Sequence, residues 1–296
     1  MEFAEKCALC GSSRIRAYAV SMVPGILHSS IAHCVDCGVY FANPMRSEEE
    51  LRRYYASAYY SGQNEDKIAR LPQDITNARQ NTILEVKRYR MAGVFLEIGC
   101  GYGSTLAAAR DEGYRVVGIE PSAPARKYAR EHLQLDVREG SLEACRLEPD
   151  SFDVVYAWHV IEHVPDLARF LREVHRILRP DGVFYFGTEN YRCLANRFSR
   201  AQHLLGGSLP GLDTAPEHTF LLTPNIVKRM FPRFGFRVAM ARAFQPTHKR
   251  ERFFASAKHG SALKRAIKAA VLAGVYGASV AVPPWGGHMK AALLKR

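Results

Sequence analysis

The sequence predicts an α/β fold, in which a mostly parallel sheet with crossover helices follows a small cysteine-rich unit. Two observations predict it. Between residues 93 and 245, apolar runs of strand length alternate with amphipathic helical patterns. Ahead of them stand two Cys-x-x-Cys-Gly sequences, at 7–11 and 34–38. A chain of 296 residues with 47% hydrophobic residues is long and apolar enough to bury the core that this fold needs.

Strands are expected wherever a short apolar run ends in a turn or loop. The predicted strands are 94–99, 115–120, 137–140, 152–158, 182–188, 236–244 and 289–295. Apolar residues spaced three and four apart predict a helix from 167 to 178, which a turn at 179–182 ends. Thr223 is a suitable N-cap for a later helix whose first residue is Pro224.

The segment 46–92 is expected to be a helical linker or cap between the cysteine-rich unit and the α/β region. Ser47 and Glu50 fit a capping box at the start of one helix. A second helix is expected at about 76–91, after a polar stretch that contains Pro72.

The positive charge is concentrated in the C-terminal third. The net charge is +12, and residues 190–296 hold 18 basic and three acidic side chains. Such a surface attracts phosphates, nucleic acid or an anionic membrane face, although a basic surface that only aids solubility stays open. A basic helical insert and the last strand are expected to form the segment 246–296. Its part 258–284 suits contact with a membrane surface, but packing on the core or in a homodimer is favoured because Ala and Gly insert weakly.

Neither a membrane span nor an export signal is expected. No uncharged apolar run has the unbroken length of about 18 residues or more that a span requires. The first residues, MEFAEKC, lack the basic start and apolar core of a secretory signal. Seven cysteines without such a signal indicate reduced thiols or metal ligands, and a cytoplasmic location.

The sharpest motif is the glycine loop after the first strand, with Gly99, Gly101 and Gly103 at every second position. Glycines permit a tight turn and a close approach of ligand to backbone, and a loop in this place forms a binding crevice. The dinucleotide fingerprint needs a glycine where this chain has Ser104, so the spacing favours a ligand with no pyrophosphate. A sulfonium nucleoside is such a ligand, and acidic Glu97 would lie near its positive end.

The following strands supply further candidate contacts at the same crevice. Glu120 ends the second strand, where a carboxylate can accept hydrogen bonds from both hydroxyls of a ribose. Ser141 and Leu142 follow the third strand, where a small and an apolar residue can hold an adenine ring. Trp158 and His159 lie at the tip of the fourth strand and face the same crevice.

These blocks together resemble the class I S-adenosylmethionine-dependent methyltransferases over about residues 94–244. The matching blocks are the glycine loop with Glu97, the ribose acid Glu120, the fourth-strand signatures FDVV and EHVPD, and LRPDGVFYFGTEN in the fifth strand. The resemblance implies a Rossmann-like, seven-stranded, mostly parallel sheet whose last strand runs antiparallel between its neighbours. It also implies S-adenosyl-L-methionine as cofactor and a cofactor-binding core at 93–245. A Rossmann-like oxidoreductase, or a fold that retains no cofactor, is the alternative.

The four cysteines Cys7, Cys10, Cys34 and Cys37 form two knuckles. Zinc takes four soft ligands in a tetrahedron, so a ribbon with a structural Zn²⁺ is expected at 1–45, the alternative being a coincidental grouping of reduced thiols. The ribbon holds as many acidic as basic side chains, which argues against nucleic-acid binding. A ribbon, a tyrosine-bearing helix and this core together resemble bacterial small-molecule methyltransferases, several of which act on nucleotide-linked sugars.

Three histidines are candidates for the chemistry. In methyl transfer the protein chiefly positions the acceptor and excludes water, and an alcohol or carbon acceptor also needs a base. His218 is the preferred base, with Glu217 to orient it, in a loop that resembles the substrate lid of the family. His163 is a second catalytic candidate, although anchoring the following helix is the favoured role. His159 is expected to line the cofactor pocket.

The expected function is methyl transfer to a small, anionic biosynthetic intermediate such as a nucleotide-linked sugar, whose phosphates would meet the basic C-terminal third. Asn190 and Tyr191 are expected to touch this acceptor. One alternative is methylation of ribosomal or transfer RNA, which the C-terminal charge leaves open and the near-neutral ribbon does not favour. Another is a lipid-linked or quinone-like acceptor. A non-catalytic module that only binds the cofactor is favoured least.

Overall fold

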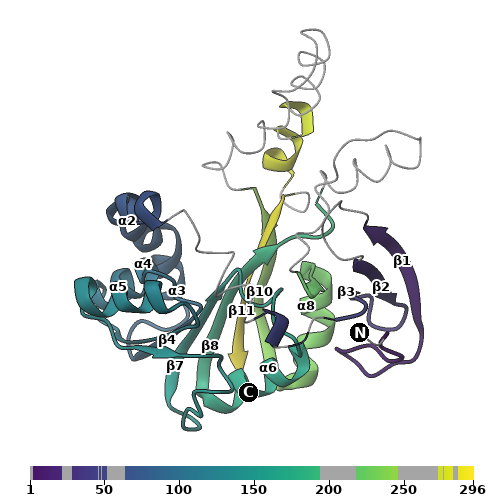
Figure 1. Ribbon diagram of the computed structural model, residues 1–296, viewed down its shortest axis with the longest axis horizontal. Coiled ribbons are helices and arrows are strands. Elements are labelled where there is room, and N and C mark those ends of the chain that lie inside the picture. Colours follow the sequence, from purple (N-terminus) through teal and green to yellow (C-terminus); the bar gives the residue numbers. More distant parts are fainter. Residues whose placement is uncertain are drawn as a thin grey trace.

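The protein, seen here in a computed structural model, contains a seven-stranded sheet and a separate four-stranded sheet (Figure 1). The residues that the structure describes are 3–21, 29–45, 47, 49–51, 64–193, 218–245, 273–275, 277–282 and 286–296. Glu217 and most of the segment 258–284 lie outside them, so the predictions made for these residues are left as they stand.

The larger sheet has the strand order β10-β11-β8-β7-β4-β5-β6. Its strands are β4 (Val94–Ile98), β5 (Arg115–Glu120), β6 (Val137–Glu139), β7 (Phe152–Trp158), β8 (Leu178–Glu189), β10 (Phe236–Phe244) and β11 (His288–Lys295). Strands β4 to β8 pair in parallel, and β11 runs antiparallel between β8 and β10. The predicted seven-stranded sheet with an antiparallel last strand is therefore confirmed.

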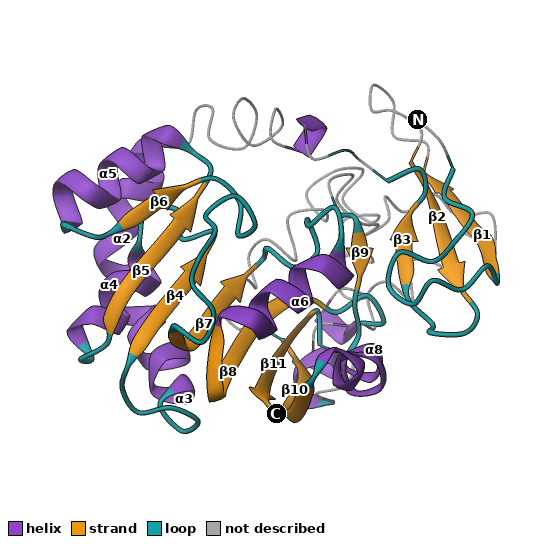
Figure 2. Cartoon of the chain, turned by 90° about the horizontal axis from the view of Figure 1, so that it is seen from below, coloured by secondary structure: helices purple, strands orange, loops and turns teal. Residues whose placement is uncertain are grey.

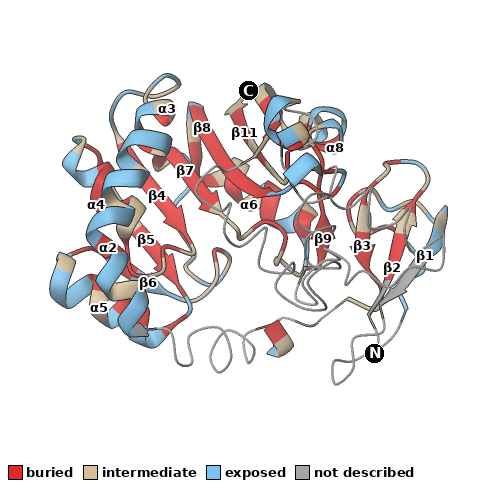
Figure 3. Cartoon of the chain, turned by 90° about the horizontal axis from the view of Figure 1, so that it is seen from above, coloured by how far each residue is buried: buried red, intermediate tan, exposed pale blue. Residues whose placement is uncertain are grey.

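Helices cover both faces of this sheet (Figure 2). On one face lie α2 (Asn64–Ala78), the π-helical turn η1 (Arg79–Ile83), α3 (Leu84–Val86), α4 (Ser104–Asp111) and α5 (Ala123–Leu133); on the other lie α6 (Leu167–Ile177), α8 (Pro224–Met230) and the 3₁₀ turn η2 (Phe231–Phe234). Successive side chains of a strand point to opposite faces. In β4, Phe95 packs with the α4 side and Leu96 with the α6 side, and both are fully buried. Figure 3 shows that β4 and β7, in the middle of the sheet, are buried along most of their length.

Two predicted helix starts are confirmed by their caps. The Ser47 N–H donates to Glu50 Oε2 at 2.8 Å, and the Glu50 N–H donates to Ser47 Oγ at 3.2 Å, which is the reciprocal capping box. The Thr223 side chain accepts from the Ile226 N–H at 3.3 Å, and Pro224 is the first residue of α8. Among the described helices, none has the length and apolar character that crossing a bilayer requires.

The helix predicted at 76–91 is wrong in its bounds. The α2 helix begins well before residue 76 and carries Pro72 in its interior. Proline removes a backbone donor and normally disfavours the middle of a helix. Here Leu71 is buried against Tyr102, so tertiary packing offsets the lost hydrogen bond.

The turn predicted at 179–182 lies within β8 instead of ahead of it. Leu178 pairs with Phe152, and the register then shifts so that Val183 pairs with Val154. Asp181 has a φ of 59°, in the left-handed region that turns use. The residues between the two pairings therefore form a bulge, and α6 passes directly into the strand.

The ribbon shares both a sheet and a core with the rest of the chain. Its sheet consists of β1 (Ile15–Ser21), β2 (Ser29–Cys34), β3 (Tyr40–Ala42) and β9 (Phe220–Leu221), and β9 belongs to the chain that follows the core strand β8. Phe41 pairs with Phe220, and both side chains are fully buried. The ribbon is thus attached to the segment that carries His218.

Candidate active site

A cavity of about 430 Å³ lies at the carboxyl ends of β4, β5 and β7. This is the edge at which open parallel sheets bind ligands, and the volume is in the range of small-molecule sites. Seven of the predicted site residues line it: Gly99, Glu120, Ser141, Leu142, Trp158, His159 and His163. Its apolar wall, which was not predicted from the sequence, includes Leu51, Val160, Val164 and Phe170.

Glu120 is held rigidly at the tip of β5. The residue is 2% exposed; its Oε2 accepts from the Gly101 N–H and its Oε1 from the Ser122 N–H, each at 2.8 Å. A carboxylate oxygen can accept a second hydrogen bond. Glu120 is therefore a rigidly held carboxylate at the cavity wall, the type of group that binds a pair of ribose hydroxyls.

The three glycines of the loop do different work. Gly99 lines the cavity with a φ of +71°, and a Cβ there would lie 2.6 Å from Val160 Cγ2. Gly103 precedes α4 with a φ of +88°, and a Cβ there would lie 2.5 Å from Leu135 Cδ1. Neither Gly101 nor Gly103 lines the described cavity. Both have a positive φ and shape the turn before α4, and the cofactor contact expected of them stays a prediction.

Glu97 also lies behind the cavity wall. It is 5% exposed, and its carboxyl group is hydrogen-bonded by the Thr105 side chain and the Leu106 N–H at the start of α4. Burial raises the pKa of Glu97 well above its usual value, and the charge of Glu120 adds to the effect. The structure therefore places Glu97 beneath the loop, where it anchors α4, and not among the residues that line the cavity.

A cluster of histidines surrounds a buried carboxylate at the end of β7. His159 has a φ of 53°. The turn that follows it carries Glu162 and His163 side by side in the sequence. His159 Nδ1 lies 3.0 Å from Glu162 Oε1. Burial would raise the pKa of Glu162, but the His159 hydrogen bond and the nearby histidine charges lower it to about 2. Glu162 was not identified as a site residue, although its HVIEH context places it three residues after one histidine and next to another.

His218 reaches this cluster from the strand that joins the ribbon. The N–H groups of Thr219 and Phe220 both donate to the Glu162 carbonyl oxygen, at 2.7 and 3.1 Å. The His218 and His163 ring centroids are 4.8 Å apart, and the His218 side chain is 8% exposed. His218 is not among the residues that line the described cavity, but it lies next to His163, which does line it. With Glu217 outside the described residues, the nearby carboxylate is that of Glu189, whose Oε2 lies 3.8 Å from His218 Nδ1.

Asn190 and Tyr191 are not at the cavity wall where an acceptor contact was predicted. The Asn190 side chain donates to the Gly286 carbonyl at 2.9 Å and is buried. Tyr191 packs on Tyr40 of the ribbon, with ring centroids 4.9 Å apart. Both residues thus contact neighbouring parts of the chain, and the acceptor contact expected of them stays a prediction.

The four ribbon cysteines lie together, as their spacing predicted. The sulfurs of Cys7 and Cys37 are 3.6 Å apart, as are those of Cys10 and Cys34, and all four lie within 4.8 Å of one another. Zn–S bonds of about 2.3 Å in a tetrahedron separate the sulfurs by about 3.8 Å. The donor set and the spacing therefore fit a structural zinc ion.

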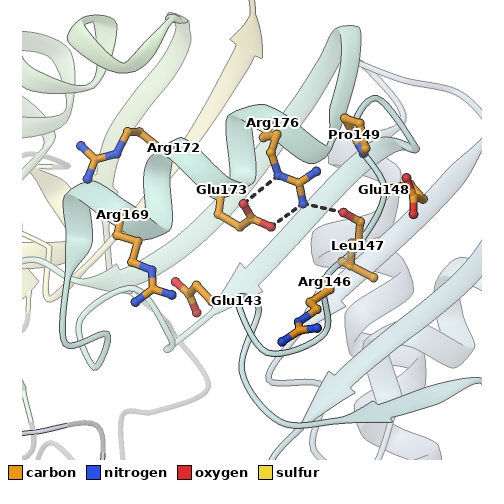
Figure 4. A pocket seen from close by; sticks show the side chains of 9 residues that line it. All are labelled: Glu143, Arg146, Leu147, Glu148, Pro149, Arg169, Arg172, Glu173 and Arg176. Carbon is orange, nitrogen blue, oxygen red and sulfur yellow. Dashed lines mark hydrogen bonds and ion pairs between the residues drawn. The ribbon is translucent and has the colours of Figure 1, made fainter.

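A second cavity, of about 590 Å³, lies along the exposed side of α6 (Figure 4). Its charged wall mixes arginines with glutamates: Arg146, Arg169, Arg172, Arg176, Glu143, Glu148 and Glu173. Arg176 already pairs with Glu173 at 2.6 Å. With charges of both signs and no cluster at a strand end, this cavity lacks the features of the first one.

Comparison with known proteins finds similarity over the region of the larger sheet. Residues 96–186 match a family described as "Methyltransferase domain". The chain is 33% identical over 166 residues to a Mycolicibacterium smegmatis protein named "Probable S-adenosylmethionine-dependent methyltransferase", covering 54% of this chain and 58% of that one. It is 37% identical over 107 residues to a ubiquinone biosynthesis O-methyltransferase of Actinobacillus pleuropneumoniae, covering 32% of this chain and 45% of the relative.

The solved structures show the same fold. A Haemonchus contortus phosphoethanolamine N-methyltransferase 2, in complex with S-adenosyl-L-methionine, matches with a TM-score of 0.55 at 16% identity, covering 95% of this chain and 68% of that one. The chain spans about half the length of the curated relatives it matches. The sheet order and this structure show the class I methyltransferase fold, and residues 96–186 match the methyltransferase domain.

Proposed function

We propose that this chain transfers a methyl group from S-adenosylmethionine to a hydroxyl of a small organic acceptor. The observation that carries the proposal is Glu120, an anchored and buried carboxylate at the tip of β5, in the wall of the cavity. Glu120 would hold the ribose hydroxyls, while Ser141 and Leu142 would flank the adenine. The Gly99 backbone would lie against the remainder of the nucleoside, where no side chain intervenes.

The histidine cluster marks the end of the cavity at which the acceptor would bind. The bound cofactor supplies a methyl group activated by positive sulfur. His159 and His163 line the cavity, so an acceptor held between them would exclude water from the reacting atoms. His218, next to His163, would take the proton from the acceptor hydroxyl, in the role that we expected of it from the sequence.

For the acceptor we propose a small anionic intermediate such as a nucleotide-linked sugar. The basic surplus of residues 190–296 supports it, because phosphates seek such a surface. Relatives named as ubiquinone biosynthesis O-methyltransferases support the second candidate, a quinone-like acceptor methylated on oxygen. We further propose that the four ribbon cysteines hold Zn²⁺ as a structural ion.

The cofactor assignment is tested by calorimetry with S-adenosylhomocysteine, the product form of the cofactor. We expect the wild-type chain to bind it and Glu120→Ala to weaken the binding by about 1–3 kcal/mol, because the ribose hydroxyls lose a charged acceptor. Glu131→Ala, which removes an exposed carboxylate of α5 outside the cavity lining, is the matched control and should bind normally. Unchanged binding in Glu120→Ala, or uptake of a nicotinamide dinucleotide by a chain that ignores S-adenosylhomocysteine, would overturn the proposal.

A further inference from the structure

We propose that Glu162, His163 and His218 form a site for one divalent first-row transition-metal ion at the acceptor end of the cavity. The site is separate from the four ribbon cysteines. The proposal that this site binds a metal ion rests on geometry alone. Only the role of the ion in the reaction rests on the proposed function.

The first argument is the convergence of three ligand groups. One carboxylate oxygen and one nitrogen of each imidazole all lie within 4.8 Å of one another. Metal–ligand bonds of about 2.0–2.2 Å place neighbouring ligand atoms about 3.0–3.5 Å apart, so small side-chain rotations would close the set. Two members come from the turn after β7, and β9 brings the third, so the backbone already holds the group together.

The second argument is a buried carboxylate oxygen with an unused bonding capacity. The Glu162 side chain is 2% exposed, and its Oε1 contacts His159 Nδ1 at 3.0 Å. Within the described residues, its Oε2 has no hydrogen-bond partner. A polar atom buried without a partner is destabilising, and a cation between Glu162 and the two imidazoles would remove that destabilisation.

The side chains next to the three ligands are also of the chemical types that accompany ligands in known metal centres. A ligating carboxylate is usually oriented by a further hydrogen bond, and His159 supplies one to Glu162. A ligating imidazole is usually accompanied by a carboxylate, and Glu189 Oε2 lies 3.8 Å from His218 Nδ1.

The ligand set defines the class of ion. Two imidazoles and one carboxylate suit Mn²⁺, Fe²⁺, Co²⁺ or Zn²⁺, and three protein ligands leave positions open for another molecule. Since His163 lines the cavity, those positions face the proposed acceptor. A hydroxyl beside the ion would lose its proton to solvent more readily. Its oxygen would then bond to the methyl carbon while the carbon–sulfur bond breaks, and the ion would take over the part that the proposed function gives to His218.

The test uses Mn²⁺, the weakest binder of the divalent series, so that zinc stays on the ribbon cysteines. The zinc-loaded full chain is titrated with Mn²⁺, and the free ion is measured by electron paramagnetic resonance. We expect one Mn²⁺ per wild-type chain and binding about 10-fold or more weaker in both Glu162→Gln and His218→Gln. Glu143→Gln, which removes a carboxylate at the same cavity outside the cluster, is the matched control and should bind Mn²⁺ normally.

Absence of Mn²⁺ binding by the wild-type chain, or equal binding by the wild type and the cluster variants, would overturn the site. S-adenosylhomocysteine binding is measured on the same samples. If the chain binds this compound but no Mn²⁺, the proposed function stands and the metal site is overturned. If it binds Mn²⁺ but not this compound, the metal site stands and the proposed function is overturned. If the buried Glu162→Gln variant does not fold, His163→Asn, at a more exposed position, gives the same decision.

Discussion

At the scale of single residues, the backbone conformation of the glycine loop makes one position sensitive to a methyl group. Gly99 has a φ of +71°, and a Cβ there would lie 2.6 Å from Val160 in the cavity wall. Gly113 has a φ of +92°, but a Cβ there would lie in open space. The two positions therefore separate the strain of the left-handed backbone from the clash.

We expect Gly113→Ala to cost about 1–2 kcal/mol of unfolding free energy from backbone strain alone. Gly99→Ala should cost more, because Val160 must also move, and it should weaken S-adenosylhomocysteine binding. Urea denaturation and calorimetry on both variants measure this. Equal stability and equal binding in the two would show that the loop tolerates the side chain.

His218 gives the second prediction at this scale. As either base or metal ligand it acts on the acceptor, so His218→Ala should lower turnover by about 100-fold or more while S-adenosylhomocysteine affinity is kept. His132→Ala, an exposed histidine of α5, is the control and should turn over normally. A labelled-methyl assay against small-molecule extract provides the readout; full turnover in His218→Ala would remove this residue from the reaction.

At the scale of elements, the ribbon and the active site are joined through one short pairing. β3 pairs with β9, and the Ala42 N–H donates to the Thr219 carbonyl at 2.9 Å. On its other side Thr219 donates to Glu162. The backbone beside His218 is therefore fixed between the ribbon and the cluster.

Loss of the ribbon metal should consequently impair turnover more than cofactor binding. Cys10→Ser removes one proposed zinc ligand, so we expect loss of bound zinc and a fall in turnover, with S-adenosylhomocysteine binding nearly unchanged because the cavity wall near Glu120 is distant in the sheet. Cys145→Ser, a partly buried cysteine outside the cluster, should do neither. Metal content, calorimetry and turnover are measured on both; a zinc-free Cys10→Ser chain with full turnover would contradict the coupling.

At the scale of the whole molecule, Asp153 ties together the ends of several strands at the edge opposite the cavity. Its carboxylate accepts from the Val94 N–H at 2.8 Å and from Arg90 at 3.1 Å, and it pairs with Arg179. Burial would raise the pKa of Asp153, but these hydrogen bonds and charges hold it below its usual value. The stabilisation is thus complete above the usual aspartate pKa of about 3.9 and is lost as the pH falls through the lower folded value.

Asp153→Asn should therefore lower the unfolding free energy by about 1–3 kcal/mol at pH 7. The difference from the wild type should shrink as the pH falls below about 3.9. Urea denaturation of both proteins at pH 7 and at a pH below about 3.9 measures this difference in unfolding free energy. A difference that stays constant with pH would mean that the charge of Asp153 contributes nothing to stability.

Much of this protein was determined by short-range sequence patterns. The glycine loop, Glu120 at a strand end and the paired cysteines were predictable, because each depends on spacing along a few residues and on turn chemistry. The bounds of α2 were not predictable, because Pro72 disfavours a helix interior and the packing of Leu71 that offsets it is a tertiary contact. The hydrogen bond from Asn190 to Gly286 was not predictable either, because the two residues are far apart in the sequence.

Only the tertiary structure decided how the chemistry is assembled. The meeting of His218 with Glu162 depends on β9 joining the ribbon sheet while its backbone bonds to the turn after β7, and contacts between such distant segments leave no periodic pattern in either one. Burial decided the rest: it placed Glu97 beneath the loop and left one oxygen of Glu162 without a partner among the described residues. Spacing along a chain specifies local geometry, whereas burial and long-range pairing exist only once the sheet has formed.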